Sequence, residues 1–268
     1  MGMPACSSRE HKVKLHYSQY VDITDKLNKM DVFGIAFRDY MAGNRDGVIR
    51  VHSNIAEPED LPVAYFFRSW DEMPEWEKTM MNQAAGHVMD VGAGAGSHAL
   101  ELQKRGVPVD AVDVSRGAAE VMRKRGVKHV YCADFFDIQF NHYDTILFLM
   151  NGVGIAGTLD GLYKLLQHAA SMLMPGGEII IESTDLMYMY EDADGSYRIP
   201  MGDQYYGELE YRLHYKNIVS EPFPWLFVDP ESLKHAAEAA GLQMRILYVG
   251  ENYNYVAALG LVPNGQDR

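Results

Sequence analysis

The sequence predicts an α/β protein with a seven-stranded, mostly parallel sheet whose last strand runs antiparallel. Between residues 87 and 185, short apolar runs alternate with segments of helical periodicity. The apolar runs are continuous, which is typical of parallel strands covered on both faces. Two further apolar runs, 243–249 and 253–262, are separated only by Gly250, Glu251 and Asn252. A connection that short permits only an antiparallel hairpin.

The core elements follow one another at short intervals. The pattern predicts strands at 87–91, 109–114, 129–132, 143–150 and 178–182, and helices at 97–105, 117–125 and 159–173. Gly106 and Gly126 stop the first two helices, and the run Pro175-Gly176-Gly177 stops the third. Asp229 and Pro230 then open a helix that extends to residue 240, before the terminal hairpin.

Two regions depart from this alternation. Residues 1–84 are helical in pattern from about 22 to 43, then contain turn residues, the aromatic run 65–67 and a capping box formed by Ser69 and Glu72. Residues 207–216 alternate between apolar and charged positions, which predicts a half-buried antiparallel strand. We therefore expect an N-terminal helical lid (1–84), an α/β core (85–185), a β insertion after the fifth strand that forms a substrate lid (186–228), and a C-terminal helix and hairpin that complete the core sheet (229–268).

Composition narrows the classes of function. The chain has 268 residues, of which 47% are hydrophobic and 23% charged, as in ordinary globular proteins. Its apolar runs are far shorter than the ~20 residues that cross a bilayer, and its first residues lack the apolar segment of a signal peptide. We expect a cytoplasmic protein with no membrane partner. The net charge of −13 argues against nucleic acid as a partner. Two cysteines, and histidines without metal-ligand spacing, predict no metal site.

The main chemical signal is the loop DVGAGAGS at 90–97, between the first core strand and the helix after it. Glycines there let the backbone approach a ligand closely. The third glycine comes one position earlier than in the dinucleotide fingerprint, which disfavours a nicotinamide or nucleotide-sugar enzyme. Asp113 ends the second strand, where a carboxylate can accept hydrogen bonds from both hydroxyls of a ribose. Asp134 and Asn151 follow the third and fourth strands, at the edge of the sheet where ligands bind.

Together these motifs resemble the class I S-adenosylmethionine-dependent methyltransferases. The resemblance is carried by VMDVGAGAGSHAL, Asp113, CADFF, YDTILFLMNG and LMPGGEIII, and by the C-terminal order of helix, strand and antiparallel strand. It covers about residues 85–262 and implies a Rossmann-like fold. The segments NRDGVIRVHS, PVAYFFRSW and LMNGVGIAGTLDGL also resemble a subgroup of bacterial small-molecule methyltransferases of unknown substrate.

The resemblance implies that residues 85–185 bind S-adenosyl-L-methionine, with S-adenosyl-L-homocysteine as product. It assigns the methionine end to Asp90, Gly92, Ala93, Gly94 and Gly96, the ribose to Asp113, the adenine to Val114, Asp134 and Phe135, and the reactive methyl region to Asn151. Arg68 is a further candidate, to pair with a carboxylate of the cofactor or the substrate, and an exposed salt bridge is the alternative for this residue. For Asp113, Asp134 and Phe135, ordinary roles as a helix cap, a turn residue and a core side chain stay open.

The predicted function is methyl transfer to an oxygen or nitrogen of a small molecule by in-line displacement. No motif identifies a catalytic base, so the candidates are His52, His98 and Asp185, each of which also has a structural interpretation. No Asn-Pro-Pro-Tyr motif follows the fourth strand, which disfavours methylation of adenine or glutamine. The alternatives that stay open are a non-catalytic cofactor-binding scaffold, an enzyme with the same fold and different transfer chemistry, and methylation of a protein or RNA. Both a monomer and a homodimer are compatible with the sequence.

Overall fold

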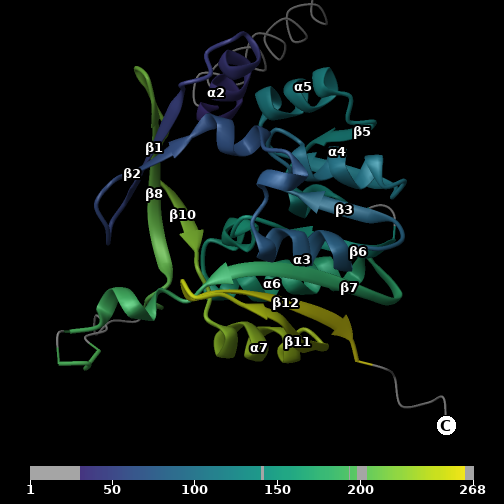
Figure 1. The fold of residues 1–268 in the computed structure, drawn as a ribbon. Helices are drawn as coiled ribbons and strands as arrows, with labels where there is room; N and C mark the ends of the chain where they lie inside the picture. The colour runs from purple at the N-terminus through teal and green to yellow at the C-terminus, as the bar shows by residue number, and fades with distance from the viewer. Residues whose placement is uncertain (1–30, 140–141, 193, 198–203, 263–268) are drawn as a thin grey trace, which may run out of the picture.

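A seven-stranded sheet forms the centre of the computed structural model, which describes residues 31–139, 142–192, 194–197 and 204–262 (Figure 1). The strand order is β11-β12-β7-β6-β3-β4-β5, and β12 runs antiparallel to both of its neighbours. In chain order the strands are β3 (Val88–Val91), β4 (Val109–Asp113), β5 (His129–Cys132), β6 (Tyr143–Phe148), β7 (Leu173–Thr184), β11 (Leu242–Val249) and β12 (Asn254–Leu261). This arrangement confirms the predicted fold class.

Helices cover both faces of this sheet because its central strands are apolar on both sides. One face packs against α6 (Leu159–Ser171) and α7 (Pro230–Ala239). The other packs against α3 (Glu75–Gln83), α4 (Ser97–Lys104) and α5 (Arg116–Arg125). Ile179 and Ile181 of β7 lie in the first layer and Ile180 in the second, as the alternation of a strand requires. Among the helices of the described ranges, none is long and apolar enough to cross a membrane.

A second, antiparallel sheet stands beside the carboxyl ends of the parallel core strands (Figure 1). Its strands are β1 (Val48–Ser53), β2 (Glu59–Pro62), β8 (Glu208–Tyr215), β9 (Ile218–Val219) and β10 (Phe223–Leu226). The order is β10-β8-β1-β2, with β9 also paired to β8. Arg50 lies opposite His214 in this sheet, so two segments that are distant in sequence form one wall.

The helix α2 (Val32–Met41) joins this wall to the core. Asp31 accepts hydrogen bonds from the N–H of Gly34 and from the N–H of Gly117 in the first turn of α5, at 2.8 and 2.9 Å. A Cβ at Gly117 would lie 2.5 Å from the backbone of Gly34, so the two helices approach each other closely because both residues are glycines. The first turn of α2 is therefore fixed beside the end of β4.

Most predicted elements agree with the structure; the strands β1, β2, β9 and β10 of the second sheet were not predicted, and β7 begins at Leu173 instead of Glu178. The sequence pattern predicted the core strands, the terminal hairpin, β8 and the capping box at Ser69 and Glu72. It did not predict β1 and β2, because Pro58, Pro62 and several polar residues give 44–68 the look of turns. The helix expected from about residue 22 begins, within the described residues, at Val32; residues 22–30 lie outside them.

Candidate functional site

The glycine-rich loop between β3 and α4 has two sides with different surroundings. Gly92 and Gly96 both have positive φ angles, +70° and +82°, which side chains rarely adopt. A Cβ at Gly96 would lie 2.9 Å from the side chains of Met122 and Val127, so this glycine packs against the protein. A Cβ at Gly92 would meet no atom within 4 Å. Gly92 therefore faces open space, into which a ligand can approach the backbone.

Asp113 lies at the end of β4, next to this loop. Its carboxylate accepts hydrogen bonds from the N–H of Gly94 and the N–H of Ser115, both at 2.8 Å. The pKa of Asp113 is raised to about 6, chiefly by burial and to a smaller extent by the carboxylates Asp31 and Asp90, against the effect of these two hydrogen bonds. Each carboxylate oxygen keeps a second lone pair, so hydroxyl groups of a ligand can still bind there.

Two buried polar atoms near the loop have no hydrogen-bond partner in the structure. One is Oδ2 of Asp90, a residue that is 1% exposed, and the other is Nε of Arg68. Burial also raises the pKa of Asp90. Because buried polar atoms are nearly always hydrogen bonded, these two atoms are the sort that a polar ligand completes. One is an acceptor and the other a donor.

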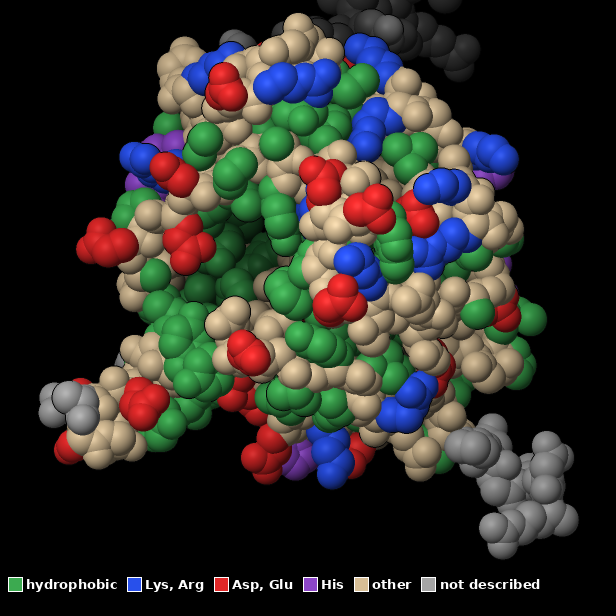
Figure 2. Space-filling model, in the orientation of Figure 1, with side chains coloured by type: hydrophobic (Ala, Val, Ile, Leu, Met, Phe, Trp, Pro, Cys, Tyr) green, Lys and Arg blue, Asp and Glu red, His purple; other side chains and the backbone are tan. Residues whose placement is uncertain are grey.

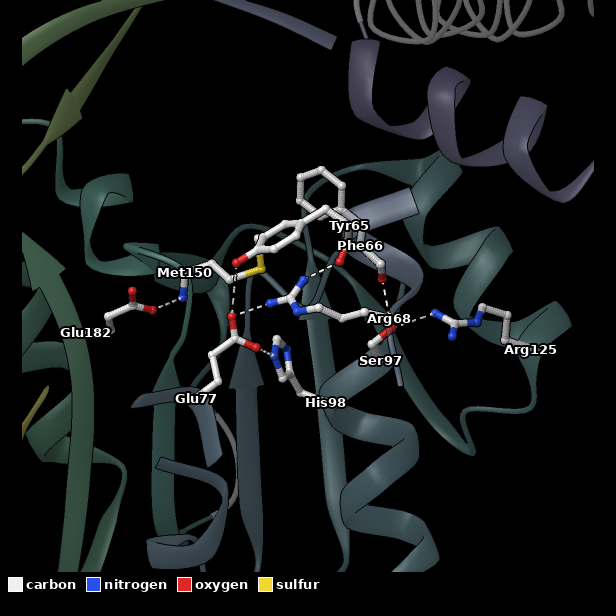
Figure 3. A network of polar contacts seen from close by, with 9 residues as sticks. All are labelled: Tyr65, Phe66, Arg68, Glu77, Ser97, His98, Arg125, Met150 and Glu182. Atoms are coloured by element: carbon white, nitrogen blue, oxygen red, sulfur yellow. Dashed lines mark hydrogen bonds and ion pairs between the residues drawn. The ribbon is translucent and has the colours of Figure 1, made fainter. Parts of the chain in front are cut away.

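Arg68 belongs to a buried cluster with Glu77 and His98, which we call the paired cluster (Figure 3). Arg68 donates to Glu77 Oε1 and to the carbonyl of Tyr65, and Nε2 of His98 lies 2.9 Å from Glu77 Oε2. Burial alone would raise the pKa of Glu77, but His98 and Arg68 hold it below its usual value. The cluster joins the start of α4 to α3 and to the 3₁₀ helix η1 (Val63–Phe67). Sequence analysis did not identify Glu77.

The turn after β6 has a strained backbone that a buried carboxylate supports. Met150 and Asn151 both have positive φ angles, 55° and 53°, which costs energy for residues other than glycine. Glu182 of β7 accepts a hydrogen bond from the N–H of Met150 at 2.7 Å and another from the N–H of Asn151. Burial and, to a smaller extent, the charge of Glu77 together raise the pKa of Glu182 to about 7. Sequence analysis did not identify Glu182, although a carboxylate in the apolar run IIIEST is a signal that could have found it.

The remaining predicted cofactor residues lie at the same edge with different environments. Val114 is 75% exposed beside Asp113. Asp134 accepts a hydrogen bond from the N–H of Phe136 and caps the 3₁₀ helix η3 (Phe135–Asp137). Phe135 is buried against Phe148, and Phe136 is the exposed ring of the pair. Ala93 is buried in the core layer of α4.

The three candidate bases are not brought together. His98 is held by Glu77 in the paired cluster. His52 lies on β1, on the face opposite Val51, which packs against the core, and its ring centroid is 4.2 Å from that of His214. Asp185 caps the 3₁₀ helix η5 (Leu186–Tyr190) at the end of β7 and accepts a hydrogen bond from the hydroxyl of Tyr206 at 2.8 Å. Of the three, only Asp185 follows a parallel core strand directly.

An apolar hollow opens between the second sheet and the core (Figure 2). Tyr211 of β8 lies parallel to Trp225 of β10, with ring centroids 6.1 Å apart. Trp225 in turn packs on the 3₁₀ helix η4 (Gly152–Ala156), where a Cβ at Gly154 would lie 2.2 Å from its ring. The aromatic side of the second sheet thus reaches the turn at Asn151.

The sheet order, the glycine loop after the first core strand and the carboxylate after the second define a Rossmann-like methyltransferase fold. The chain belongs to the methyltransferase domain family, whose family model matches residues 72–246. A solved S-adenosylmethionine-dependent methyltransferase from Bacteroides fragilis, in complex with S-adenosyl-L-homocysteine, is 38% identical, with a TM-score of 0.81 over 87% of this chain and 96% of that one.

Two further similarities are more distant. The cypemycin N-terminal methyltransferase of a Streptomyces species is 30% identical over 102 residues, 37% of this chain. The sugar N-methyltransferase KedS8 of Streptoalloteichus sp ATCC 53650 shares the fold, with a TM-score of 0.51 and 17% identity over 79% of this chain and 97% of that one. The matches to two curated relatives span only 42% and 2% of the relatives' own lengths.

Proposed function

We propose that the protein uses S-adenosyl-L-methionine to methylate an oxygen or nitrogen of a small molecule by in-line displacement. The observation that carries this proposal is the set of groups around Gly92. An open space lies beside its backbone, with the unpartnered Oδ2 of Asp90 and the carboxylate of Asp113 near the same loop. The protein from Bacteroides fragilis, which is crystallised with S-adenosyl-L-homocysteine, supports the choice of cofactor.

The groups present fit the chemistry of this cofactor. Asp90 would accept a hydrogen bond from the ammonium group of the methionine part, and Nε of Arg68 would donate one to its carboxylate. Asp113 would accept hydrogen bonds from the ribose hydroxyls, while the exposed side chain of Val114 would contact the adenine. Asp134 retains an acceptor oxygen for the adenine amino group, and Phe136 is the ring exposed there. This last assignment moves the adenine contact from the buried Phe135 to its neighbour.

When bound, the cofactor supplies an electrophilic methyl group on a sulfonium. The chain must place a nucleophile in line with that methyl and exclude water. The turn at Met150 and Asn151 is fixed by Glu182, and the apolar hollow next to it suits a small molecule better than a polymer. Asp185 is the candidate base that we retain, because His98 is held by Glu77 and His52 lies on the outer face of the second sheet.

Calorimetric titration with S-adenosyl-L-homocysteine tests this proposal. We expect the wild-type protein to bind, and Asp113→Asn to bind about 100-fold more weakly, because two hydrogen bonds to a charged acceptor are weakened. Asp46→Asn is the matched control, since Asp46 is an exposed carboxylate between α2 and β1 and is not among the residues assigned to the cofactor. A folded wild-type protein that does not bind this product would refute the proposal.

A further inference from the structure

The hollow between the two sheets, which we take as the substrate cleft of the proposed methyltransferase, has an aromatic wall. Tyr211 is at its centre, with the ring centroids of Trp225, Phe223 and Phe227 between 6.1 and 6.2 Å away. Trp225 extends the wall to η4, directly after Asn151. Aromatic rings in this arrangement offer an apolar surface and the negative faces of their π systems.

The wall continues to a group of tyrosines beside Asp185. Tyr188 acts electrostatically on Tyr211 and stacks on Tyr253, with centroids 4.7 Å apart. The N–H of Asp185 donates to the carbonyl of Tyr253, and its carboxylate accepts from Tyr206. Tyr188, Tyr253 and Tyr206 thus form one group with Asp185, and Tyr188 is near enough to Tyr211 to affect its pKa. Asp185 follows β7, so it lies at the carboxyl edge of the core sheet, where the reactive end of the cofactor would lie.

Carboxylates of the described residues act on this surface. Burial raises the pKa of Tyr188, Tyr206 and Tyr211, and the charged neighbours that raise these pKa values further include Glu59 for Tyr188 and Tyr211, and Asp185 for Tyr206. Asp and Glu side chains also lie around the mouth of the hollow (Figure 2).

Arg212 follows Tyr211 directly, but the alternation of β8 places it on the opposite, outer face of the second sheet. Arg68 is bound to Glu77 in the paired cluster, and Arg50, which lies on the outer face of β1, pairs with Asp60. Among the described residues that we place along the cleft, none offers a free cation to a carboxylate or phosphate of a substrate. An anionic substrate would therefore be repelled, whereas a cation gains from both the aromatic faces and the carboxylates.

We propose that the substrate of this methyltransferase carries a protonated amine on an apolar body about the size of a ring, and that the amine nitrogen receives the methyl group. The ammonium lies between the aromatic wall and Asp185. Asp185 takes one proton from it, which frees the nitrogen lone pair. That pair forms the new N–C bond while the C–S bond breaks and leaves its electron pair on sulfur, so the products are an N-methylammonium and a neutral thioether.

Three probes with the same aromatic body separate the possible charges: 2-phenylethylamine, 2-phenylethanol and phenylacetate. Each is titrated at millimolar concentration into full-length protein saturated with S-adenosyl-L-homocysteine. We expect the amine to bind at least tenfold more tightly than the other two. Asp185→Asn and Glu59→Gln should each reduce this preference several-fold. Glu57→Gln is the control and should leave the preference unchanged, because Glu57 is an exposed carboxylate just before β2, the strand that Glu59 begins.

The outcomes separate the substrate class from the function on which it rests. Equal or tighter binding of the alcohol or the acid, or no binding of any probe to protein that binds S-adenosyl-L-homocysteine, would overturn the amine proposal and leave the methyltransferase proposal intact. Loss of S-adenosyl-L-homocysteine binding itself would count against the methyltransferase proposal. An amine preference that persists in both Asp185→Asn and Glu59→Gln would also overturn the assignment of the carboxylates.

Discussion

Two buried groups of ionisable side chains lie close together near the glycine loop and differ in how their charges are balanced. In the paired cluster, Glu77 contacts both Arg68 and His98. In the other group, Asp90, Asp113 and Glu182 have raised pKa values because they are buried. Within the described ranges, none of these three carboxylates is hydrogen bonded or ion-paired to a basic side chain.

The difference separates side chains that hold the fold from side chains that are open to a ligand. Breaking a buried ion pair leaves an uncompensated charge, so a paired group is tied to stability. Buried carboxylates without a cation cost stability when they ionise, and a ligand that brings hydrogen-bond donors or positive charge offsets this cost. Substitutions in the two groups should therefore act on different measurements.

Glu77→Ala has the largest expected effect on stability. The substitution leaves the Arg68 guanidinium buried without a counter-charge, so we expect the free energy of unfolding to fall by about 3–5 kcal/mol. Urea denaturation followed by circular dichroism measures this change. Glu75→Ala is the control on the same helix, because its pair with Lys78 is exposed and contributes about 0.5 kcal/mol or less. Equal effects of the two substitutions would show that the paired cluster is not structural.

Glu182→Gln should change how stability depends on pH. The pKa of Glu182 is about 7 in the folded protein, above its ordinary value of 4.5. Between these values the folded state retains a proton that the unfolded state has lost, so stability falls as pH rises, by about 3 kcal/mol over the window. Asp113, whose pKa is raised from 3.8 to about 6, likewise makes stability fall as pH rises between these two values.

In Glu182→Gln, which has no ionisable group at this position, the free energy of unfolding should depend much less on pH above pH 6. Urea denaturation of both proteins at intervals from pH 5 to 8 is the measurement. Parallel stability curves for wild type and Glu182→Gln would contradict the raised pKa. The same series should also show whether the turn at Met150 and Asn151 needs the charged form, through the affinity for S-adenosyl-L-homocysteine at each pH.

Two alanine substitutions in the glycine loop sharpen the comparison at the level of single methyl groups. Both force a side chain into a positive φ angle, at a cost of about 1 kcal/mol. In Gly96→Ala the Cβ also meets Met122 and Val127, so the free energy of unfolding should fall by about 2–3 kcal/mol in total. In Gly92→Ala the Cβ enters open space, so stability falls less and the affinity for S-adenosyl-L-homocysteine falls more. Urea denaturation and calorimetric titration of both variants measure these changes. A larger loss of stability in Gly92→Ala, or a larger loss of affinity in Gly96→Ala, would contradict this comparison.

Val114→Ala has the smallest expected effect. The side chain is 75% exposed, so stability should change by no more than about 0.5 kcal/mol. If Val114 contacts the adenine, its truncation removes about 1 kcal/mol of binding free energy from apolar burial. The affinity for S-adenosyl-L-homocysteine then falls about fivefold. Val219→Ala, at an exposed valine of the second sheet, is the matched control. An unchanged affinity would remove Val114 from the site.

The parts of the molecule that the sequence predicted depend on local signals. Apolar runs and glycine stops placed the core strands within one or two residues at most ends, and Asp113 was found because it ends one of them. Tertiary partners were beyond the same reasoning. Glu77 looked like one more polar residue of a short helix, and its role depends on Arg68 and His98 being beside it. Likewise, nothing around Arg50 indicates that His214 lies opposite.

The pairing of β1 with β8 has a consequence for the order in which the protein assembles. The core strands β3 to β7 are joined by connections of a few tens of residues at most, whereas the chain between Ser53 and Glu208 must be folded before its ends can meet. Closing so long a loop is entropically costly and slow. During synthesis the edge that carries the proposed cofactor residues would exist before the wall of the proposed substrate cleft. An early folding intermediate should therefore bind S-adenosyl-L-homocysteine while it is still unable to retain a methyl acceptor.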